Sequence, residues 1–500
     1  MPTVRAMLKR ILLAFFGSLT GVLLALGALR VALYFGLVSL PVGAGRDGAA
    51  SADYLREVLG LVNAHYVDAQ GVGTGTEGLA REAIRGLVGS LDPHSEFLEA
   101  EHFQRFEEDL DGDFGGIGVQ VESRSGRVVV IAPIAGTPGA RAGLRRGDEI
   151  VRVDGHEIGS EGRPPMDDAL KRLRGAPQTP VRVSIWRPSA EEELELEIVR
   201  ERIEIDSVRE ARLLGATVGG SGGGGSIGYI QLVDFSARTG DQFVAALDKL
   251  LAEGAQALIL DLRNNPGGLL DAAVAVVEPF FEQGELVVYT RGRDASGGVS
   301  DASAGREGRE GREVREELRA QMVGQPLSLP IAVLINSGTA SAAEIVTGAL
   351  KDTGRAVVVG ERSFGKGSVQ TLFKLRDGSG LRITTSRYYT PSGVSIHGRG
   401  IEPDVPLIMT PEEDDKLRLQ RARADVLELA DAAEFEAQFG FAPIADKQLE
   451  AAADVLHGVQ LLRTRGFAQA LHRERSAQTA APSEPLSSDA LAEAQPISAR

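Results

Sequence analysis

Cysteine is absent from the 500-residue sequence. Its absence excludes disulfides, iron–sulfur clusters, thiolate zinc sites and a cysteine nucleophile, and it leaves the redox compartment open. Aromatic residues are scarce at 5%, with a single tryptophan. Basic residues are outnumbered, because 54 Lys and Arg stand against 70 Asp and Glu, which gives a formal charge of −16. A nucleic acid is therefore not an expected partner, since phosphate recognition needs a basic surface.

The remaining composition is that of a folded protein. Apolar residues make up 43% of the chain and charged residues 25%, which excludes wholesale disorder, a collagen-like chain and a polytopic membrane protein. At about 100–200 residues per domain, the length predicts about three domains.

One long uncharged run lies near the N-terminus, from Ile11 to Leu29, and Arg5, Lys9 and Arg10 precede it. About 20 apolar residues span a bilayer as a helix, and flanking positive charge keeps that end in the cytoplasm. The run exceeds the usual apolar region of a signal peptide, about 7–15 residues. We therefore expect an inner-membrane anchor with the rest of the chain in the periplasm. A cleaved signal, with its site near Val42–Ala44, is the alternative.

Changes of pattern divide the chain into successive parts. Apolar residues at helical spacing (Leu55, Val58, Leu59 and Val62) mark a helical region after the N-terminal segment. Alternating short strands follow, and then a glycine-rich run at Gly219–Ser226. The expected parts are the anchor segment 1–45, a helical region 51–110, a β-rich module 112–204, a core 205–408 with a charged insertion 291–320, a helical region 410–475 and a disordered tail 476–500.

The core alternates strands with helices, which predicts an α/β domain with a substantially parallel sheet. The expected strands are Ile227–Leu232, Ala257–Leu262, Leu286–Tyr289, Ile331–Ile335 and Ala356–Val359, and the expected helices are Asp241–Ala252, Leu269–Phe281 and Ala340–Lys351. In the insertion, repeated Arg-Glu pairs indicate an exposed loop that leads into a charged helix. Thr410-Pro411-Glu412-Glu413 is a typical helix start, with a cap, a proline in the first turn and a glutamate at the third position.

Three short stretches of the core carry residue types that suit acyl-transfer chemistry. Asp261–Gly268 ends in two glycines before a helix, where backbone N–H groups can approach an oxyanion, although such a turn is also ordinary loop geometry. Asn336–Glu344 places hydroxyls at a strand-to-helix corner, where a single serine more often only caps the helix. Glu344 receives no role.

The third stretch is Gly365–Gln370, in which Lys366 stands between two glycines. Burial disfavours a charged ammonium and can leave a lysine neutral near pH 7, so that it can act as a base. A neutral lysine beside a serine hydroxyl is one form of the nucleophile–base pair.

Together with Leu91–Leu98, these stretches resemble the carboxyl-terminal processing (tail-specific) proteases, which are PDZ-containing Ser–Lys serine peptidases. The resemblance covers about residues 50–410. It implies a spiral, crotonase-like α/β core with flanking helices, and a small β-rich PDZ domain before it. It further implies Ser341 as the nucleophile, Lys366 as the general base and Gln370 as the residue that orients the lysine. The implied oxyanion donors are the backbone N–H groups of Ala342 and of Gly267 or Gly268, and no metal or organic cofactor is implied.

The same resemblance extends to the β-rich module. Gly116, Ile117, Gly118 and Val119 resemble the loop with which a PDZ domain holds a terminal carboxylate, and Gly143–Ile150 resembles a PDZ turn and strand. An adjacent strand would accept the peptide by β-augmentation. Protein substrates with accessible C-terminal tails are the implied partners, while a homodimer and an adaptor protein stay open. His94, in an Asp-Pro turn, is interpreted as structural.

Two other functions compete with this interpretation. One is a catalytically inactive PDZ scaffold, or binding protein, on a protease-like fold. The other is a hydratase-like acyl-transfer enzyme on a related spiral fold, which would not need a Ser–Lys pair. The presence of all three dyad-associated residues argues against the scaffold, and the presence of Lys366 argues against the hydratase-like enzyme.

Overall fold

The computed structural model describes residues 46–67, 75–124, 126–160, 164–214, 226–293, 313–421, 435–436 and 440–464. The expected anchor, most of the Gly-Ser run, most of the charged insertion and the expected disordered tail lie outside these ranges. Contacts divide the chain into one unit of residues 1–97 and 292–314 and a second of residues 98–291 and 315–500. Within the described residues, no helix has the length and apolarity needed to cross a membrane.

The first unit contains two helices that contact one another, α2 (Arg46–His65) and α3 (Gly75–Gly89). Leu55, Val58 and Val62 do lie on a helix, but their side chains are exposed to solvent. Strand β1 (Glu96–Leu98) follows the Asp-Pro turn. In that turn the Asp92 carboxylate accepts the backbone N–H groups of His94 and Ser95 at 2.8 and 2.9 Å, a local turn stabilised by its own side chain.

Helix α4 (Ala100–Asp111) opens the second unit, and a small antiparallel sheet follows it. The sheet order is β3-β4-β5-β7-β8, with β6 paired to β5, while β2 pairs with β9. Its strands and helices are β2 (Asp113–Gly116), β3 (Val119–Arg124), β4 (Arg127–Pro133), α5 (Pro138–Arg141), β5 (Glu149–Val153), β6 (His156–Glu157), α6 (Pro165–Leu173), β7 (Pro180–Arg187), β8 (Glu192–Val199) and β9 (Glu201–Glu204). Alternate residues of the strands form a core of their own under α6.

A buried ion pair fixes one turn of this small domain. Arg187 donates two hydrogen bonds of 2.8 Å to the carboxylate of Asp148 and a third, of 2.9 Å, to the carbonyl of Gly143. The Oδ2 atom of Asp148, which accepts one of the Arg187 bonds, also accepts the backbone N–H of Arg145 at 2.8 Å. The buried carboxylate of Asp148 therefore stabilises the turn within the Gly143–Ile150 stretch.

The central sheet of the core has the order β10-β11-β12-β15-β16-β19. Within this sheet, strands β11, β12, β15, β16 and β19 run parallel to one another, and β10 is antiparallel to β11. The strands are β10 (Val208–Leu214), β11 (Ile227–Leu232), β12 (Ala257–Asp261), β15 (Ile331–Ile335), β16 (Ala356–Gly360) and β19 (Val405–Pro406). Their nearly continuous apolar runs are explained by burial on both faces.

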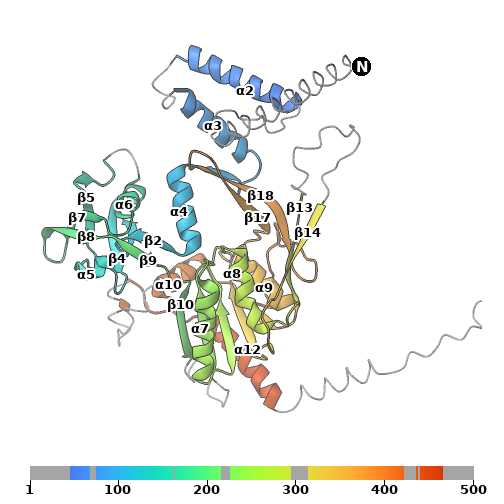
Figure 1. Ribbon diagram of the computed structural model, residues 1–500. Helices are drawn as coiled ribbons and strands as arrows, with labels where there is room; N and C mark the ends of the chain where they lie inside the picture. Colours follow the sequence, from blue (N-terminus) through green and yellow to red (C-terminus); the bar gives the residue numbers. More distant parts are fainter. Residues whose placement is uncertain are drawn as a thin grey trace, which may run out of the picture. The chain divides into compact units, whose positions relative to one another are not determined.

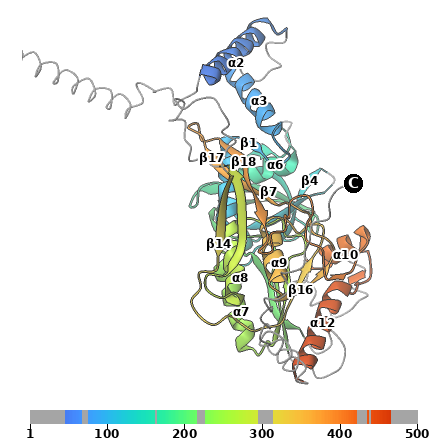
Figure 2. The ribbon, with the colours of Figure 1, turned by 90° about the vertical axis from the view of Figure 1, so that its right-hand side faces the viewer.

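Helices cover both faces of that sheet. One face packs against α7 (Thr239–Ala252), α8 (Leu270–Val277) and α9 (Ala342–Asp352), and the other packs against α12 (Lys447–Thr464) (Figure 1). Figure 2 shows α12 and α10 (Pro411–Arg421) on the side away from α7 and α8. The predicted α/β core, with a small β-rich domain before it, is confirmed.

A second sheet carries part of the chemistry. Here β17 (Ser368–Lys374) pairs antiparallel with β18 (Gly380–Tyr389), and β18 neighbours β13 (Leu286–Arg293), which neighbours β14 (Glu313–Arg319). The expected charged helix at the end of the insertion is wrong, because residues 313–319 form a strand beside β13. The expected helix Leu269–Phe281 is shorter than predicted, since a 3-10 turn (Glu278–Phe280) that contains Pro279 replaces its last part.

The predicted helix start at Thr410 is confirmed. The Glu413 carboxylate accepts the N–H of Thr410 at 2.9 Å, and the Thr410 hydroxyl accepts the N–H of Glu413 at 3.2 Å. This is the reciprocal capping box that the sequence predicted for α10.

Candidate active site

The three predicted catalytic side chains share one cavity of about 690 Å³. Ser341 follows β15, the two glycines follow β12, and β12 and β15 are adjacent parallel strands. Their carboxyl ends therefore bring both turns to one edge of the sheet, where sites of α/β proteins form. The lining also includes Lys366 and Gln370 from the start of the second sheet, and apolar side chains of α4 and the turn after Gly268: Phe106, Leu110, Leu269 and Leu270.

Ser341 has a strained backbone. It precedes α9 with φ +54° and ψ −117°, a conformation that glycine adopts readily and that costs other residues about 1–3 kcal/mol. Only 8% of the residue is exposed. Strain of this kind is typical of a nucleophile at a sharp strand-to-helix turn, which holds the hydroxyl above the sheet.

Gly267 packs directly against the serine. A Cβ atom at this position would lie 2.7 Å from the Ser341 Cβ and 2.8 Å from the Ala342 nitrogen, so no larger residue fits. Ala342 is the first residue of α9, and its N–H therefore has no acceptor within the helix.

The backbone bonding around the glycines distinguishes the two. Gly267 donates its N–H to the side-chain oxygen of Asn265 at 2.8 Å. Phe235 donates to the carbonyl of Gly267 and accepts from the N–H of Leu269, so that its two bonds pass over Gly268. Within the described part of the chain, the N–H of Gly268 consequently has no acceptor, whereas that of Gly267 does.

Lys366 and Gln370 contact one another, as their spacing in an extended strand predicts. The Lys366 Nζ donates to the Gln370 Oε1 at 3.4 Å. Burial lowers the pKa of Lys366 below its ordinary value, and the positive charge of Arg382 in the same cavity lowers that pKa further. Among the described residues, no hydrogen bond joins the Ser341 hydroxyl to the Lys366 amine, although both residues line the cavity.

Tyr388 also borders the serine, which sequence reasoning missed. Burial raises the pKa of Tyr388 to about 12, and a hydrogen bond with the Ser341 side chain opposes part of that rise. The phenol is therefore neutral at ordinary pH and lies beside the serine hydroxyl. Nothing in the pattern around Tyr388 distinguishes it from the other residues of β18.

Glu344 is the other residue to which the sequence gave no role. Its fully buried carboxylate accepts four hydrogen bonds, from Ser341 N–H at 2.9 Å, Ser363 Oγ at 2.5 Å, Gly365 N–H at 2.7 Å and Lys366 N–H at 2.8 Å. Burial raises its pKa, and these donors oppose that rise. One carboxylate thus joins the backbone of the serine to the backbone of the lysine. The Ser-x-x-Glu spacing of a capping box was the signal that could have identified it.

The predicted tail-binding residues lie in the small β-rich domain, away from this cavity. Gly116 ends β2, Val119 begins β3, and Gly118 between them has φ +69° and packs against Thr137. Among the strands that the structure describes, β3 has β4 on one side and no strand on the other. The loop therefore opens onto a free sheet edge that lies beside α6.

Comparisons with known proteins match both domains. The model of peptidase family S41 matches residues 226–407, and a PDZ domain model matches residues 115–198. A carboxy-terminal-processing protease of Bartonella bacilliformis is 38% identical over 332 residues, which cover 65% of this chain and 69% of that protein. A probable CtpA-like serine protease of Staphylococcus aureus is 33% identical over 395 residues, 79% of this chain and 72% of that protein.

Two solved structures are among those that align. The photosystem II D1 C-terminal processing protease is 30% identical with a TM-score of 0.38, over 70% of this chain and 92% of that one. A putative S41 protease from Bacteroides fragilis is 16% identical with a TM-score of 0.43, over 81% of this chain and 97% of that one.

Proposed function

The chain belongs to peptidase family S41 and is a PDZ-containing serine peptidase of the carboxy-terminal-processing type, and on that premise we propose that Ser341 and Lys366 form its catalytic dyad. The resemblance inferred from the sequence motifs is confirmed at the level of the family. The roles of individual residues are our proposal.

The observation that carries the assignment is the position of Ser341. It is held in a strained conformation at the start of α9, against Gly267 and the N–H of Ala342, in the cavity that also contains Lys366. A serine that only capped the helix would gain nothing from that strain.

In the proposed reaction, the neutral Lys366 amine takes the proton of the Ser341 hydroxyl while Oγ bonds to the scissile carbonyl carbon. The tetrahedral oxyanion accepts hydrogen bonds from the N–H groups of Ala342 and Gly268. The C–N bond then breaks, and Lys366 returns the proton to the leaving amine. Water, deprotonated by the same lysine, hydrolyses the acyl-enzyme and restores the serine. Gln370, through its side-chain oxygen, holds the lysine amine in place.

We further propose that the PDZ domain selects substrates by their C-terminal tails. The free edge of β3 offers backbone groups for an added strand, and the Gly116–Val119 loop at its start offers N–H groups to a terminal carboxylate. The bound tail would then be cleaved as an endopeptidase substrate in the cavity beside Ser341.

The proposal places the enzyme at the inner membrane with its catalytic domain in the periplasm. It rests on the uncharged run within residues 1–45, which lies outside the described residues. Extraction of membranes with alkaline carbonate tests it. We expect the full chain to stay in the membrane pellet and a variant without residues 1–45 to be released.

Cleavage of a denatured protein by the full chain and by its Ser341→Ala variant tests the function. We expect fragments from the parent and none from the variant, with both forms binding the substrate. Equal cleavage by both would exclude Ser341 as the nucleophile. Binding without cleavage by the parent would instead support the inactive scaffold.

A further inference from the structure

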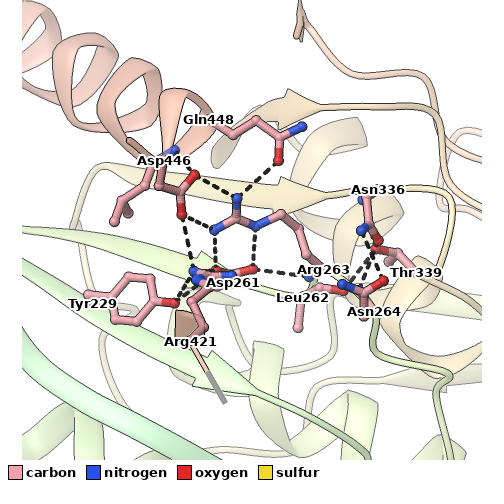
Figure 3. A network of polar contacts seen from close by, with 11 residues as sticks. Tyr229, Asp261, Leu262, Arg263, Asn264, Asn336, Thr339, Arg421, Asp446 and Gln448 are labelled. Carbon is pink, nitrogen blue, oxygen red and sulfur yellow. Dashed lines mark hydrogen bonds and ion pairs between the residues drawn. The ribbon is translucent and has the colours of Figure 1, made fainter. Parts of the chain in front are cut away.

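A cluster of four buried or largely buried charges lies behind the oxyanion turn, outside the catalytic cavity (Figure 3). Asp261 ends β12, Arg263 belongs to the turn that leads to the glycines, Arg421 ends α10, and Asp446 immediately precedes α12. Two carboxylates and two guanidinium groups make the cluster neutral as a whole. Two of the four members come from the C-terminal segment, beyond the residues 226–407 that match the peptidase model.

Arg263 is held from both sides. Toward the sheet its Nε and Nη2 donate to the Asp261 carboxylate at 3.0 and 2.7 Å. Toward the C-terminal segment its Nη1 and Nη2 each donate to Asp446 at 2.8 Å, and Nη1 donates to Gln448 at 3.0 Å. Only 2% of the Arg263 side chain is exposed, so water cannot replace these partners.

Arg421 completes the cluster. It contacts the Asp261 carboxylate, and it donates at 2.6 Å to the hydroxyl of Tyr229, which itself donates to Asp261 at 2.8 Å. Burial by itself would raise the pKa of Asp261, but Arg263 and Arg421 outweigh it and hold that pKa well below its ordinary value. Asp261 is therefore ionised, and loss of the Asp446 charge alone would leave the other three members with one uncompensated positive charge.

The residues that follow Arg263 are bonded to the turn that carries the serine. Asn264 and Asn336 exchange two hydrogen bonds, at 2.8 and 3.1 Å, and the Thr339 hydroxyl donates to the carbonyl of Leu262 at 2.8 Å (Figure 3). The N–H of Ala340 donates to the carbonyl of Asn265 at 2.9 Å. These hydrogen bonds join the turn that follows Arg263 to the turn that precedes Ser341, and they thereby set the position of Gly268 relative to Ser341.

We propose that Asp446 and Arg421 are positioning residues for the oxyanion hole. Asp446 binds Arg263 directly, Arg421 binds the Asp261 and Asp446 carboxylates that hold Arg263, and Arg263 in turn holds the Gly268 N–H at its place beside Ser341. This inference rests on the proposed function, since it assumes that Gly268 is an oxyanion donor. Without the charge of Asp446, a buried guanidinium keeps its positive charge but loses its second carboxylate, and the turn relaxes around it. The C-terminal segment is on this view part of the catalytic machinery and not an appendage to it.

Asp446→Asn in the full chain is the sharpest test. Asp446 caps α12 by accepting the N–H of Leu449 at 3.0 Å, and asparagine is an equally good cap, so the variant removes the charge and keeps the helix start. The quantities to measure are kcat and KM for a peptide substrate and the inhibition constant of the matching peptide aldehyde. The aldehyde adds the Ser341 oxygen to its carbonyl carbon, the hydroxyl proton passes to the Lys366 amine, and the new oxyanion occupies the oxyanion hole.

We expect kcat to fall about tenfold to hundredfold, KM to change little, and the aldehyde inhibition constant to rise in proportion to the loss of kcat/KM. Asp446→Glu, which keeps the charge, should restore most of the activity. A purely structural role would lower the melting temperature without weakening the aldehyde relative to the substrate. Unchanged aldehyde inhibition in Asp446→Asn would overturn the proposal.

Glu285→Gln is the matched control, because Glu285 forms a two-bond pair with Arg355, at 2.9 and 2.7 Å, that does not reach the oxyanion turn. It should lower stability and leave aldehyde inhibition as in the parent; weakened inhibition there too would reduce the Asp446 effect to general destabilisation. If Asp446→Asn does not fold, Arg421→Gln, which removes the other C-terminal charge of the cluster, decides by the same two constants. If the Ser341→Ala variant cleaves as well as the parent, the proposed function is wrong. If Ser341 is required but Asp446→Asn leaves aldehyde inhibition unchanged, only this further inference is wrong.

Discussion

At the scale of single residues, the proposed chemistry depends on the ionisation of Lys366. An ammonium has no lone pair for the Ser341 proton, so only the neutral fraction of the lysine is active. That fraction grows as the pH rises through the lysine pKa, which burial and Arg382 hold below its ordinary value. The rate of acylation should therefore increase with pH, and its acid limb should lie at lower pH than an exposed lysine would give.

Lys366→Arg tests the base itself. A guanidinium keeps the positive charge but stays protonated, so it cannot accept the serine proton. We expect kcat/KM for a peptide to fall by more than about a hundredfold. Steady-state cleavage within about tenfold of the parent would contradict the dyad.

Arg382→Gln tests the electrostatic part of the argument. Removing its charge from the cavity raises the pKa of Lys366, so the acid limb of the profile of kcat/KM against pH should move to higher pH. Arg387→Gln removes the same charge from an exposed position on the same strand, and it should leave the limb in place. A profile that does not move in Arg382→Gln would show that this arginine does not tune the base.

At the scale of elements, Glu344 connects the start of α9 to the loop that carries the lysine. In Glu344→Gln one of the two oxygens, each of which accepts two donors, becomes an NH₂ group that faces N–H groups. We expect kcat to fall about tenfold to hundredfold because Ser341 and Lys366 lose their common support. Glu413→Gln makes the same change in the capping box of α10 and should leave kcat within about twofold. Equal effects of the two variants on kcat would remove any special role for Glu344.

Local pattern was enough to predict some of these elements and not others. Apolar runs predicted the parallel strands, because burial on both faces leaves no other composition, and the Thr410–Glu413 signature predicted its helix start. The strand at residues 313–319 was missed because Arg and Glu suit an exposed strand as well as a helix, and only pairing with β13 decides between them.

The candidate site divides in the same way. The motif around Ser341 and the spacing of Lys366 and Gln370 can be recognised in the sequence, because each of them lies within a single turn or along a single strand. Asp446, by contrast, is 183 positions away from Arg263. No periodicity or motif joins residues at that separation, so their contact became visible only in the folded chain.

At the scale of the whole molecule, the proposed function assigns recognition of the substrate tail and cleavage of the substrate to different domains. Recognition of a tail should depend on its terminal charge, because the Gly116–Val119 loop would bind a carboxylate through backbone N–H groups. In the full chain with Ser341→Ala, we expect a peptide with a free C-terminus to bind about tenfold or more tightly than the same peptide amidated. Calorimetry measures both affinities; equal values would mean that this domain does not recognise the terminus.

The strained backbone of Ser341 also bears on how this protein and its descendants evolve. Glycine would occupy that conformation at lower cost, so the folded state gives up stability at this one position, and in the proposed mechanism turnover is what that cost supports. In a lineage that kept the fold for binding alone, selection would no longer oppose the relaxed alternative, and drift toward glycine is expected. If Ser341 is the nucleophile that we propose, a serine retained there is an inherited sign of continued proteolysis, and it can be sought in any member of the lineage before its activity has been assayed.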